Sequence, residues 1–161
     1  MLTGLTTVIL KNFAEEVING IKENIRSKQV TPYGAMNTTG KMADSLAYRI
    51  DGDGLTIFSS EKYFTVLETG RKPGKRPPID VIEKWIENKP IASDISRRSL
   101  AFLIARKIGE EGSLIYKQGG KSGIISDYVN DEYIRQNLTS VLSDTFRDYV
   151  INEFIKKSAA T

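Results

Sequence analysis

Residues 46–59 read LAYRIDGDGLTIFS and decide the fold class of this chain. On both sides of residues 51–54, apolar residues alternate with polar ones, which is typical of strands that bury one face. The Asp-Gly pairs between them favour a tight turn, because glycine readily adopts the positive φ that such turns require. The stretch therefore predicts an antiparallel β-hairpin that turns at residues 51–54.

Helical patterns lie on both sides of this hairpin. Residues 5–28 carry apolar residues at helical spacing, and residues 131–157 carry the longest such pattern in the chain. Residues 63–70 fit one or two helical turns or a short bent strand. Pro77 and Pro78 introduce a helix over residues 79–89 that Pro90 ends, and Ser93 or Asp94 is expected to cap a further helix that precedes Gly112.

These patterns predict an α+β fold in which a small antiparallel β-sheet packs against several helices, with long N- and C-terminal helices. A chain of 161 residues is long enough for one domain with its own core. We divide the predicted single domain, residues 1–161, into an N-terminal helix at 1–30, a central part at 39–112, a glycine-rich loop at 113–126 and a C-terminal helix at 127–161. The last residues of the chain, 156–161, are expected to fray.

The composition excludes several classes of function. The chain contains neither cysteine nor histidine, so disulfides, thiolate or imidazole metal sites and Ser-His-Asp triads are impossible. No spacing marks a catalytic carboxylate pair, and we expect no enzymatic activity and no cofactor. The net charge of +3 is too small to indicate a nucleic-acid-binding body by itself. No run approaches the roughly 20 apolar residues of a membrane span, and no membrane partner is expected.

Two glycine-rich motifs have a superficial likeness to ligand-binding loops. The run at residues 51–54 would need a glutamate at the twelfth position to form a calcium-binding EF-hand, and Lys62 stands there. The run at residues 119–123 would need a glycine five positions before Gly120 to form a phosphate-binding P-loop, and Ile115 stands there. We therefore predict neither a metal site nor a nucleotide site.

The basic residues fall into two groups. Four cations lie in the loop at 71–76, namely Arg71, Lys72, Lys75 and Arg76. A second set, Arg97, Arg98, Arg106 and Lys107, lies on the exposed flank of the predicted helix before Gly112. Both groups are candidate interfaces with an acidic protein surface or with a phosphate backbone, and simple solvation of a loop and a helix face is the alternative.

The segment at 113–126 is predicted to be a mobile surface loop that becomes ordered against a partner, because glycine is frequent in it. Its candidate interface residues are Tyr116, Lys117 and Lys121. The helix at 79–89 carries Trp85 on the same face as Ile82 and Ile86, so Trp85 is expected in the core rather than at an interface.

Residues 63–112 carry a specific pattern. The run YFTVLETG at 63–70 precedes the basic loop and Pro77-Pro78, and Trp85-Ile86 and the run RRSLAF at 97–102 follow. Together with the run TGKMADSL at 39–46 and the hairpin, this pattern resembles the tail-component or tail-completion proteins of tailed bacteriophages, also called head-tail joining or neck proteins. Many relatives continue after the position of Gly112 into an Arg-Pro-Phe segment, where this chain has the glycine-rich stretch instead.

The resemblance implies a structural virion protein without enzymatic activity, a ring-forming subunit at the head-tail junction or in the tail. Its implied partners are further copies of itself, neighbouring portal, connector or tail proteins and, non-specifically, the packaged DNA. In this family the loop at 71–75 projects toward neighbours in the ring. Assembly in the host cytoplasm and residence in the virion follow from the same likeness. The alternative interpretation is a nucleic-acid-binding protein that uses the basic loop at 71–76 and the helix face at 97–107.

Overall fold

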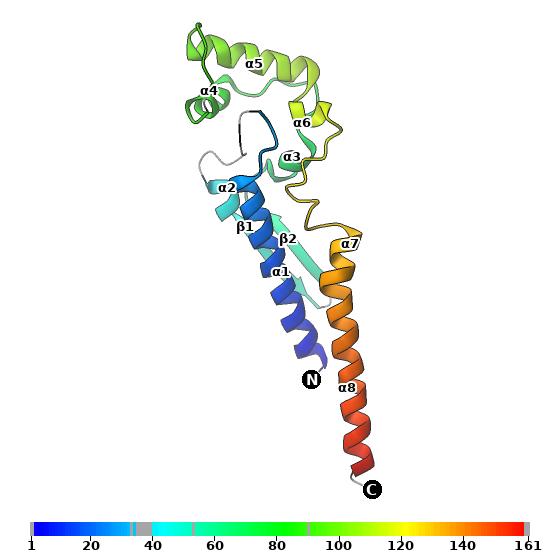
Figure 1. The fold of residues 1–161 in the computed structure, drawn as a ribbon. Helices are drawn as coiled ribbons and strands as arrows, with labels where there is room; N and C mark the ends of the chain where they lie inside the picture. The colour runs from blue at the N-terminus through cyan, green and yellow to red at the C-terminus, as the bar shows by residue number, and fades with distance from the viewer. Residues whose placement is uncertain (1, 33, 35–39, 53, 90, 160–161) are drawn as a thin grey trace.

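The computed structural model describes residues 2–32, 34, 40–52, 54–89 and 91–159, and Figure 1 shows its elements. Tyr33, Thr39, Asp53, Pro90 and residues 160–161, on which some of the predictions fall, lie outside the described residues. The fold is α+β, as predicted. Its elements are α1 (Leu2–Ser27), α2 (Lys41–Asp44), β1 (Leu46–Asp51), β2 (Gly54–Ser59), α3 (Phe64–Thr69), α4 (Ile79–Glu87), α5 (Arg97–Glu111), α6 (Leu114–Lys117), α7 (Asp131–Ile134), the π-helical turn η1 (Arg135–Thr139) and α8 (Ser140–Ala159).

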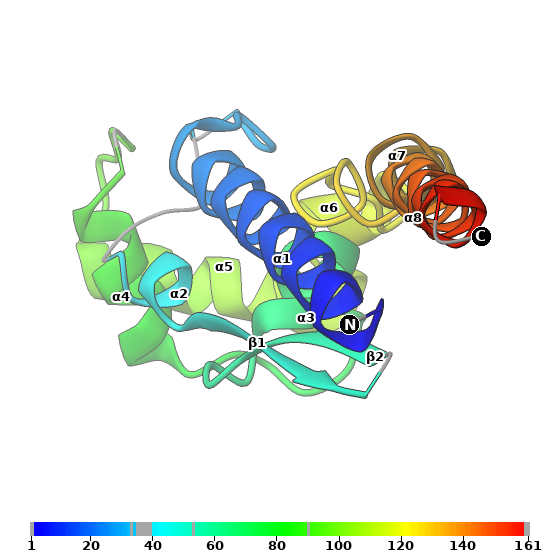
Figure 2. The same ribbon diagram turned by 90° about the horizontal axis from the view of Figure 1, so that it is seen from below.

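The predicted hairpin is confirmed. β1 and β2 pair antiparallel in a register that runs from Leu46 opposite Ser59 to Asp51 opposite Gly54. Gly52 has φ +61°, the left-handed conformation that a tight turn requires. Seen along α1, the hairpin lies against one side of that helix (Figure 2). Leu55 and Ile57 are half-buried and pack against the core, so β2 presents its apolar face to α1.

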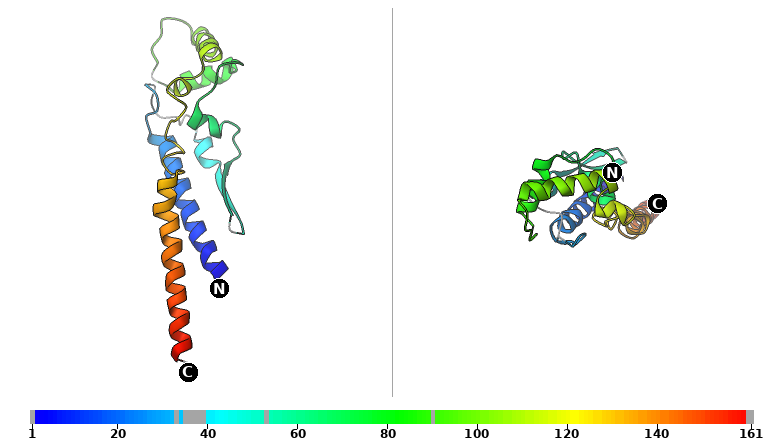
Figure 3. Two further views of the ribbon diagram at one scale, coloured as in Figure 1. Left: turned by 90° about the vertical axis from the view of Figure 1, so that its right-hand side faces the viewer. Right: turned by 90° about the horizontal axis from the view of Figure 1, so that it is seen from above.

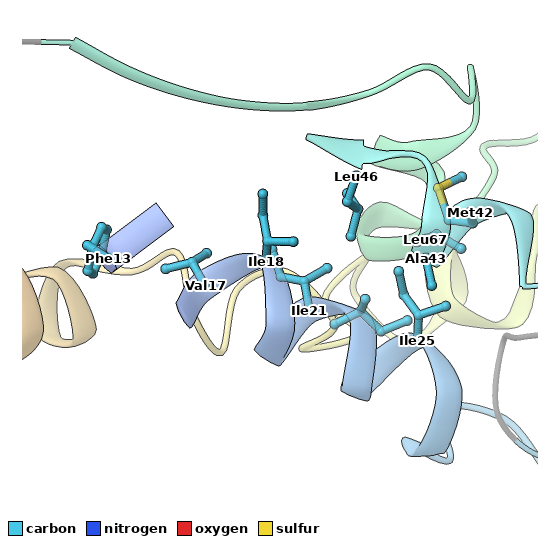
Figure 4. Close-up of a cluster of buried hydrophobic side chains, with 10 residues drawn as sticks. Phe13, Val17, Ile18, Ile21, Ile25, Met42, Ala43, Leu46 and Leu67 are labelled. Carbon is cyan, nitrogen blue, oxygen red and sulfur yellow. The ribbon is translucent and has the colours of Figure 1, made fainter. Parts of the chain in front are cut away.

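The core forms on one face of α1. Figure 4 shows Val17, Ile21 and Ile25 in a row along the helix, with Leu46 and Leu67 from other elements beside them. The buried cluster comprises Phe13, Val17, Ile18, Ile21, Ile25, Met42, Ala43, Leu46, Leu67 and Ile124. Its spacing confirms the amphipathic pattern of the N-terminal helix. The first turns of α1 have no such cover, since Leu5 and Val8 are exposed.

Helices α4 and α5 pack against each other as a helical hairpin. Ile86, Ala101 and Ala105 are its buried residues. Trp85 is only half-buried, so the prediction that it belongs to the core is wrong in part. The reason is that two helices alone leave one side of each open to solvent. Ser96, and neither Ser93 nor Asp94, caps α5 by accepting a hydrogen bond from the Ser99 N–H.

The segment predicted to be a glycine-rich loop contains regular structure and buried residues. Ser113 caps the short helix α6, and Ile115 within it is buried. Ile124 has no exposed surface and belongs to the core cluster. The stretch that contains Ile124 lies against α1, because Tyr128 packs over Gly20, where any side chain would meet its ring. The segment is therefore an integral part of the fold in the free chain.

The C-terminal helical pattern forms a nearly continuous helix of α7, η1 and α8. Ile134 and Leu138 pack against the core, as their positions in the stripe predict. Beyond them α8 runs alongside α1 and then past its N-terminal end, so both chain termini lie at the same end of the molecule (Figure 3). The helical hairpin of α4 and α5 lies at the other end (Figure 1). The molecule is elongated, with α8 as a projecting arm.

Candidate functional site

The most distinctive surface is the arm formed by α8. Several of its large apolar side chains are exposed, so they do not contribute to the core of the isolated chain. Phe146 is 56% exposed, Phe154 72% and Ile155 61%. Val141, Val150 and Ile151 are exposed as well. Soluble proteins rarely leave contiguous apolar patches of this kind without an interaction partner. The arm is therefore the first candidate for a functional site.

The apolar residues of the arm lie on more than one side of the helix. At about 100° per residue, Phe146, Val150 and Phe154 form a stripe along one side, while Ile151 and Ile155 lie on a different side. The charges between these stripes form local ion pairs, in which Arg147 lies 3.2 Å from Asp144 and 3.6 Å from Asp148.

A second apolar surface is a groove of about 320 Å³ beside α1. α1, β2, α3, the segment before α7, α7 and η1 contribute to its walls, and almost all of its lining is carbon. The lining residues are Phe13, Val17, Ile21, Leu55, Ile57, Phe64, Ile125, Tyr128, Val129, Ile134 and Leu138. Grooves of this size and polarity accept apolar side chains from a ligand or a partner.

Tyr133 holds the groove wall of α7 against α1. Its hydroxyl donates a hydrogen bond to the Glu16 carboxylate at 2.6 Å, and its ring meets that of Tyr128 edge-on, with centroids 5.4 Å apart. Partial burial and the hydrogen bond to Glu16 raise the pKa of Tyr133 to about 12. The phenol therefore stays protonated as a donor over the physiological range, and the wall keeps its position.

Glu68 anchors the segment that follows α6. Its carboxylate accepts hydrogen bonds from the N–H groups of Gly123, Ile125 and Ser126 at 3.2, 2.8 and 3.4 Å. The Ser126 and Ser122 hydroxyls donate to it at 2.7 and 3.2 Å. Partial burial acts to raise the pKa of Glu68, but the hydrogen bonds from Ser126, Ile125 and Gly123 outweigh it and lower the pKa below its usual value.

The structure brings six of the nine predicted interface residues into one place, which we call the basic corner: Arg71, Lys72, Lys75, Arg76, Tyr116 and Lys117. The backbone of the loop at 71–76 is tied to α5 and α6, because the Gly74 N–H donates to Gly109 at 2.7 Å and the Ser113 N–H to Arg71 at 2.8 Å. Gly112 lies so close to the Tyr116 ring and the Arg71 carbonyl that no side chain fits there. The absence of a side chain at Gly112 therefore allows the loop at 71–76 and α6 to pack closely together.

The charges of the basic corner are only partly compensated. Lys117 forms an ion pair with Glu111 at 2.6 Å, and Arg76 lies 3.9 Å from Glu110. The Arg71 guanidinium donates to the Lys75 carbonyl at 3.0 Å. The side chains of Lys72 and Lys75 are exposed and form no ion pair with any residue that the structure describes. These two ammonium groups are available to a partner.

The remaining three predicted residues lie apart from the basic corner. Arg97 forms an ion pair with Glu87 at 2.6 Å, and Arg98 lies 3.5 Å from Asp80 and 3.4 Å from Glu83. Both arginines thus connect the N-terminal end of α5 to α4. Along the helix, this end is about 15 Å from Lys107, the last residue of the predicted basic face. Lys121 is exposed in the turn after α6.

The predicted basic face at 97–107 is therefore not a continuous cationic surface. Arg106, toward the other end of α5, lies 3.9 Å from Glu110, so each arginine of this face has a carboxylate beside it within the chain. The attraction of such a face for a phosphate backbone is reduced by these carboxylates.

Within the described ranges, no three acidic residues are grouped so that they could hold a metal ion. None of the helices in the described part of the chain is both long and apolar enough to cross a membrane. Comparisons with protein families, with curated proteins and with solved structures found no match for this chain.

Sequence reasoning singled out cations and missed the arm, the groove and Glu68. A signal for the arm was present, because Phe146, Val150, Ile151, Phe154 and Ile155 do not fit a single stripe. The groove and the Glu68 anchor depend on contacts between segments that are far apart in the sequence, and local pattern carries no information about them.

Proposed function

We propose that this chain is a non-enzymatic structural subunit that assembles with copies of itself through the arm formed by α8. The observation that carries the proposal is the exposure of Phe146, Phe154 and Ile155 on a helix that extends beyond its own core. An apolar arm of this kind is stable in water only when association covers it. Self-association is the simplest source of such cover, because each copy brings the same surface.

We further propose that the assembly is a ring at the head-tail junction, or in the tail, of a tailed bacteriophage particle. This part of the proposal rests on the resemblance of residues 39–112 to tail-completion and neck proteins. The basic corner supports it, since Lys72 and Lys75 are free to meet acidic residues on a neighbouring portal, connector or tail protein. Opposite charges at such contacts increase the rate and the specificity of association more than its strength.

Sedimentation of the purified chain tests self-assembly. We expect the unmodified protein to sediment as an oligomer and the double variant Phe146→Ser/Phe154→Ser to sediment as a monomer that keeps the helical content of the unmodified chain by circular dichroism. The matched control is Val81→Ser/Phe102→Ser, which removes two exposed apolar side chains from α4 and α5. If the control dissociates as readily as the arm variant, or if the unmodified chain is a monomer throughout, the proposal is wrong.

Nucleic-acid binding is the second candidate function. The uncompensated ammonium groups of Lys72 and Lys75 favour it, whereas the ion pairs of Arg97 and Arg98 reduce the contribution of α5. It predicts DNA affinity that falls steeply as salt is added and that disappears in a Lys72→Ser/Lys75→Ser variant. Titration of labelled duplex DNA at two salt concentrations measures both effects.

A further inference from the structure

The groove beside α1 and the arm are complementary surfaces on one chain. The groove is an apolar hollow of about 320 Å³ with Ile57, Val129 and Leu138 among its accessible lining residues. The arm presents Phe146, Val150 and Phe154 at intervals of four residues. Recognition of a helix in an apolar groove uses anchors with this type of spacing.

The arm does not fill the groove of its own chain. Ile134 and Leu138 form part of the groove wall, and the helix continues from them away from the groove as α8 (Figures 1 and 3). To fold back, the helix would have to break, and residues 131–159 contain neither glycine nor proline. Within the residues that the structure describes, neither the groove nor the arm is covered by the other, and a second molecule can join them.

We propose that the distal turns of α8 in one copy insert into the groove of the next copy, with Phe146, Val150 and Phe154 as the inserted side chains. This inference rests on the proposed function and specifies which surfaces meet. A second copy is the occupant because the chain itself supplies a helix of the required polarity and spacing. The π-helical turn η1 marks the boundary between groove and arm. Ile134 just before it and Leu138 within it line the groove, and α8 after it forms the arm.

The two phenylalanines supply a substantial part of the area that a stable interface needs. At about 200 Å² for each phenylalanine side chain, the 56% and 72% exposure of Phe146 and Phe154 leaves about 250 Å² to be covered. That is roughly a third of the about 800 Å² that each partner buries in a standard interface. Val150, on the same side of α8, adds to it, and each copy takes part in two such contacts.

The contact has a consequence for symmetry. The arm and the groove are different surfaces, so the interface is heterologous and each copy both gives an arm and receives one. Repetition of a heterologous contact produces a closed ring or an open filament and excludes a two-fold dimer. Pairing of two α8 helices through identical faces would instead produce a two-fold contact that leaves the groove empty.

Mixing two defective variants tests the inference. Phe146→Ser/Phe154→Ser removes the arm, and Val129→Glu places a charge at the groove, where Val129 is 47% exposed. Each variant alone should remain monomeric with native helical content, and an equimolar mixture should form one-to-one pairs, because one intact arm and one intact groove remain. The matched control Val81→Glu, on α4, should assemble like the unmodified chain.

The possible outcomes separate this inference from the proposed function. If Val129→Glu assembles normally while the arm variant does not, self-association through α8 stands and insertion into the groove is wrong. If the unmodified chain does not assemble, both are wrong. If Val129→Glu fails to fold, cross-linking decides the question, because the chain has no cysteine of its own. A Val129→Cys chain mixed with a Val150→Cys chain should form mixed disulfides, and dominant Val150→Cys homodimers would overturn the inference.

Discussion

At the scale of the residue, Glu68 fixes the position of a segment more than fifty residues away in the sequence. Five donors from Ser122, Gly123, Ile125 and Ser126 surround its carboxylate. An ionised carboxylate accepts such bonds with about twice the strength of a neutral acceptor. One acidic side chain therefore holds Ile124 in the core and shapes the wall of the groove.

Substitution of this carboxylate should destabilise the fold in a pH-dependent way. Glu68→Gln should lower the free energy of unfolding at neutral pH by about 1–3 kcal/mol, because the amide accepts fewer hydrogen bonds and leaves donors unpaired. The folded-state pKa of Glu68 is lowered, so its contribution is present above the ordinary pKa of 4.5 and is lost as pH falls through the folded-state value.

Thermal melts of Glu68→Gln and the unmodified chain between neutral and acid pH measure this effect. The difference in melting temperature should shrink as pH falls from 4.5, where the unfolded chain takes up the proton, through the lower folded-state pKa, where the native carboxylate does. Glu23→Gln, at an exposed position on α1, is the control and should melt like the unmodified chain at both neutral and acid pH. A difference that stays constant across the whole range would contradict the role of ionised Glu68.

Gly70 and Gly52 allow the stability cost of adding a side chain at a packed glycine to be compared with the cost at an open one. Both have positive φ, +69° and +61°, but a Cβ at Gly70 would lie 2.4 Å from the Tyr116 nitrogen and one at Gly52 would meet nothing within 4 Å. Gly52→Ala should therefore cost about 1–2 kcal/mol of conformational strain. Gly70→Ala should cost clearly more, and equal losses in denaturant melts would show that the basic corner is not tightly packed.

At the scale of the element, the hairpin, α1, α4 and the C-terminal end of α5 at Gly112 could be predicted from the sequence, whereas the start of α5 lies after Ser96 and not after Ser93 or Asp94. Alternation, turn residues and helical periodicity are local signals that record which face is buried. The segment at 113–126 could not be predicted. Its glycines suggested mobility, whereas Gly120 and Gly123 lie at positions of positive φ where the chain passes close to Thr69 and Lys28. Glycine occurs both in mobile loops and at positions where the chain packs closely, and only tertiary contacts distinguish the two.

Hydrogen exchange should show that this segment is ordered in the free chain. The Ile125 N–H donates to Glu68 at 2.8 Å and the Gly120 N–H to Ile115 at 2.9 Å, so both amides should exchange slowly. Glu68→Gln should accelerate Ile125 while leaving Gly120 nearly unchanged. Fast exchange at both amides in the unmodified chain would restore the interpretation of a mobile loop.

At the scale of the whole molecule, the basic corner can be recognised from the sequence, whereas the arm is recognised from the exposure of its side chains. The clustering of Arg71, Lys72, Lys75 and Arg76 is visible in the sequence, and the structure places them with Tyr116 and Lys117. The C-terminal helical pattern at 131–157 is the longest in the sequence. Which of its apolar residues remain uncovered depends on how far α8 runs alongside α1, and no local pattern specifies that.

The basic corner should affect assembly without affecting stability. Lys72→Ser/Lys75→Ser should melt like the unmodified chain, because exposed charges contribute little to folding. If the chain is a phage junction subunit, the variant should yield fewer tailed, infectious particles, since electrostatic attraction to a neighbouring protein is lost. Lys11→Ser/Lys22→Ser on α1 is the control. Normal particle numbers would show that the corner is only a solvated loop.

The central claim is that the arm formed by α8 joins copies of this chain. Native mass spectrometry of the unmodified protein tests it most directly. We predict a single species whose mass is a fixed multiple of 18.0 kDa and whose dissociation requires conditions that unfold α8 or substitutions at Phe146 and Phe154. A mass of 18.0 kDa at every concentration at which the protein stays in solution would contradict the claim.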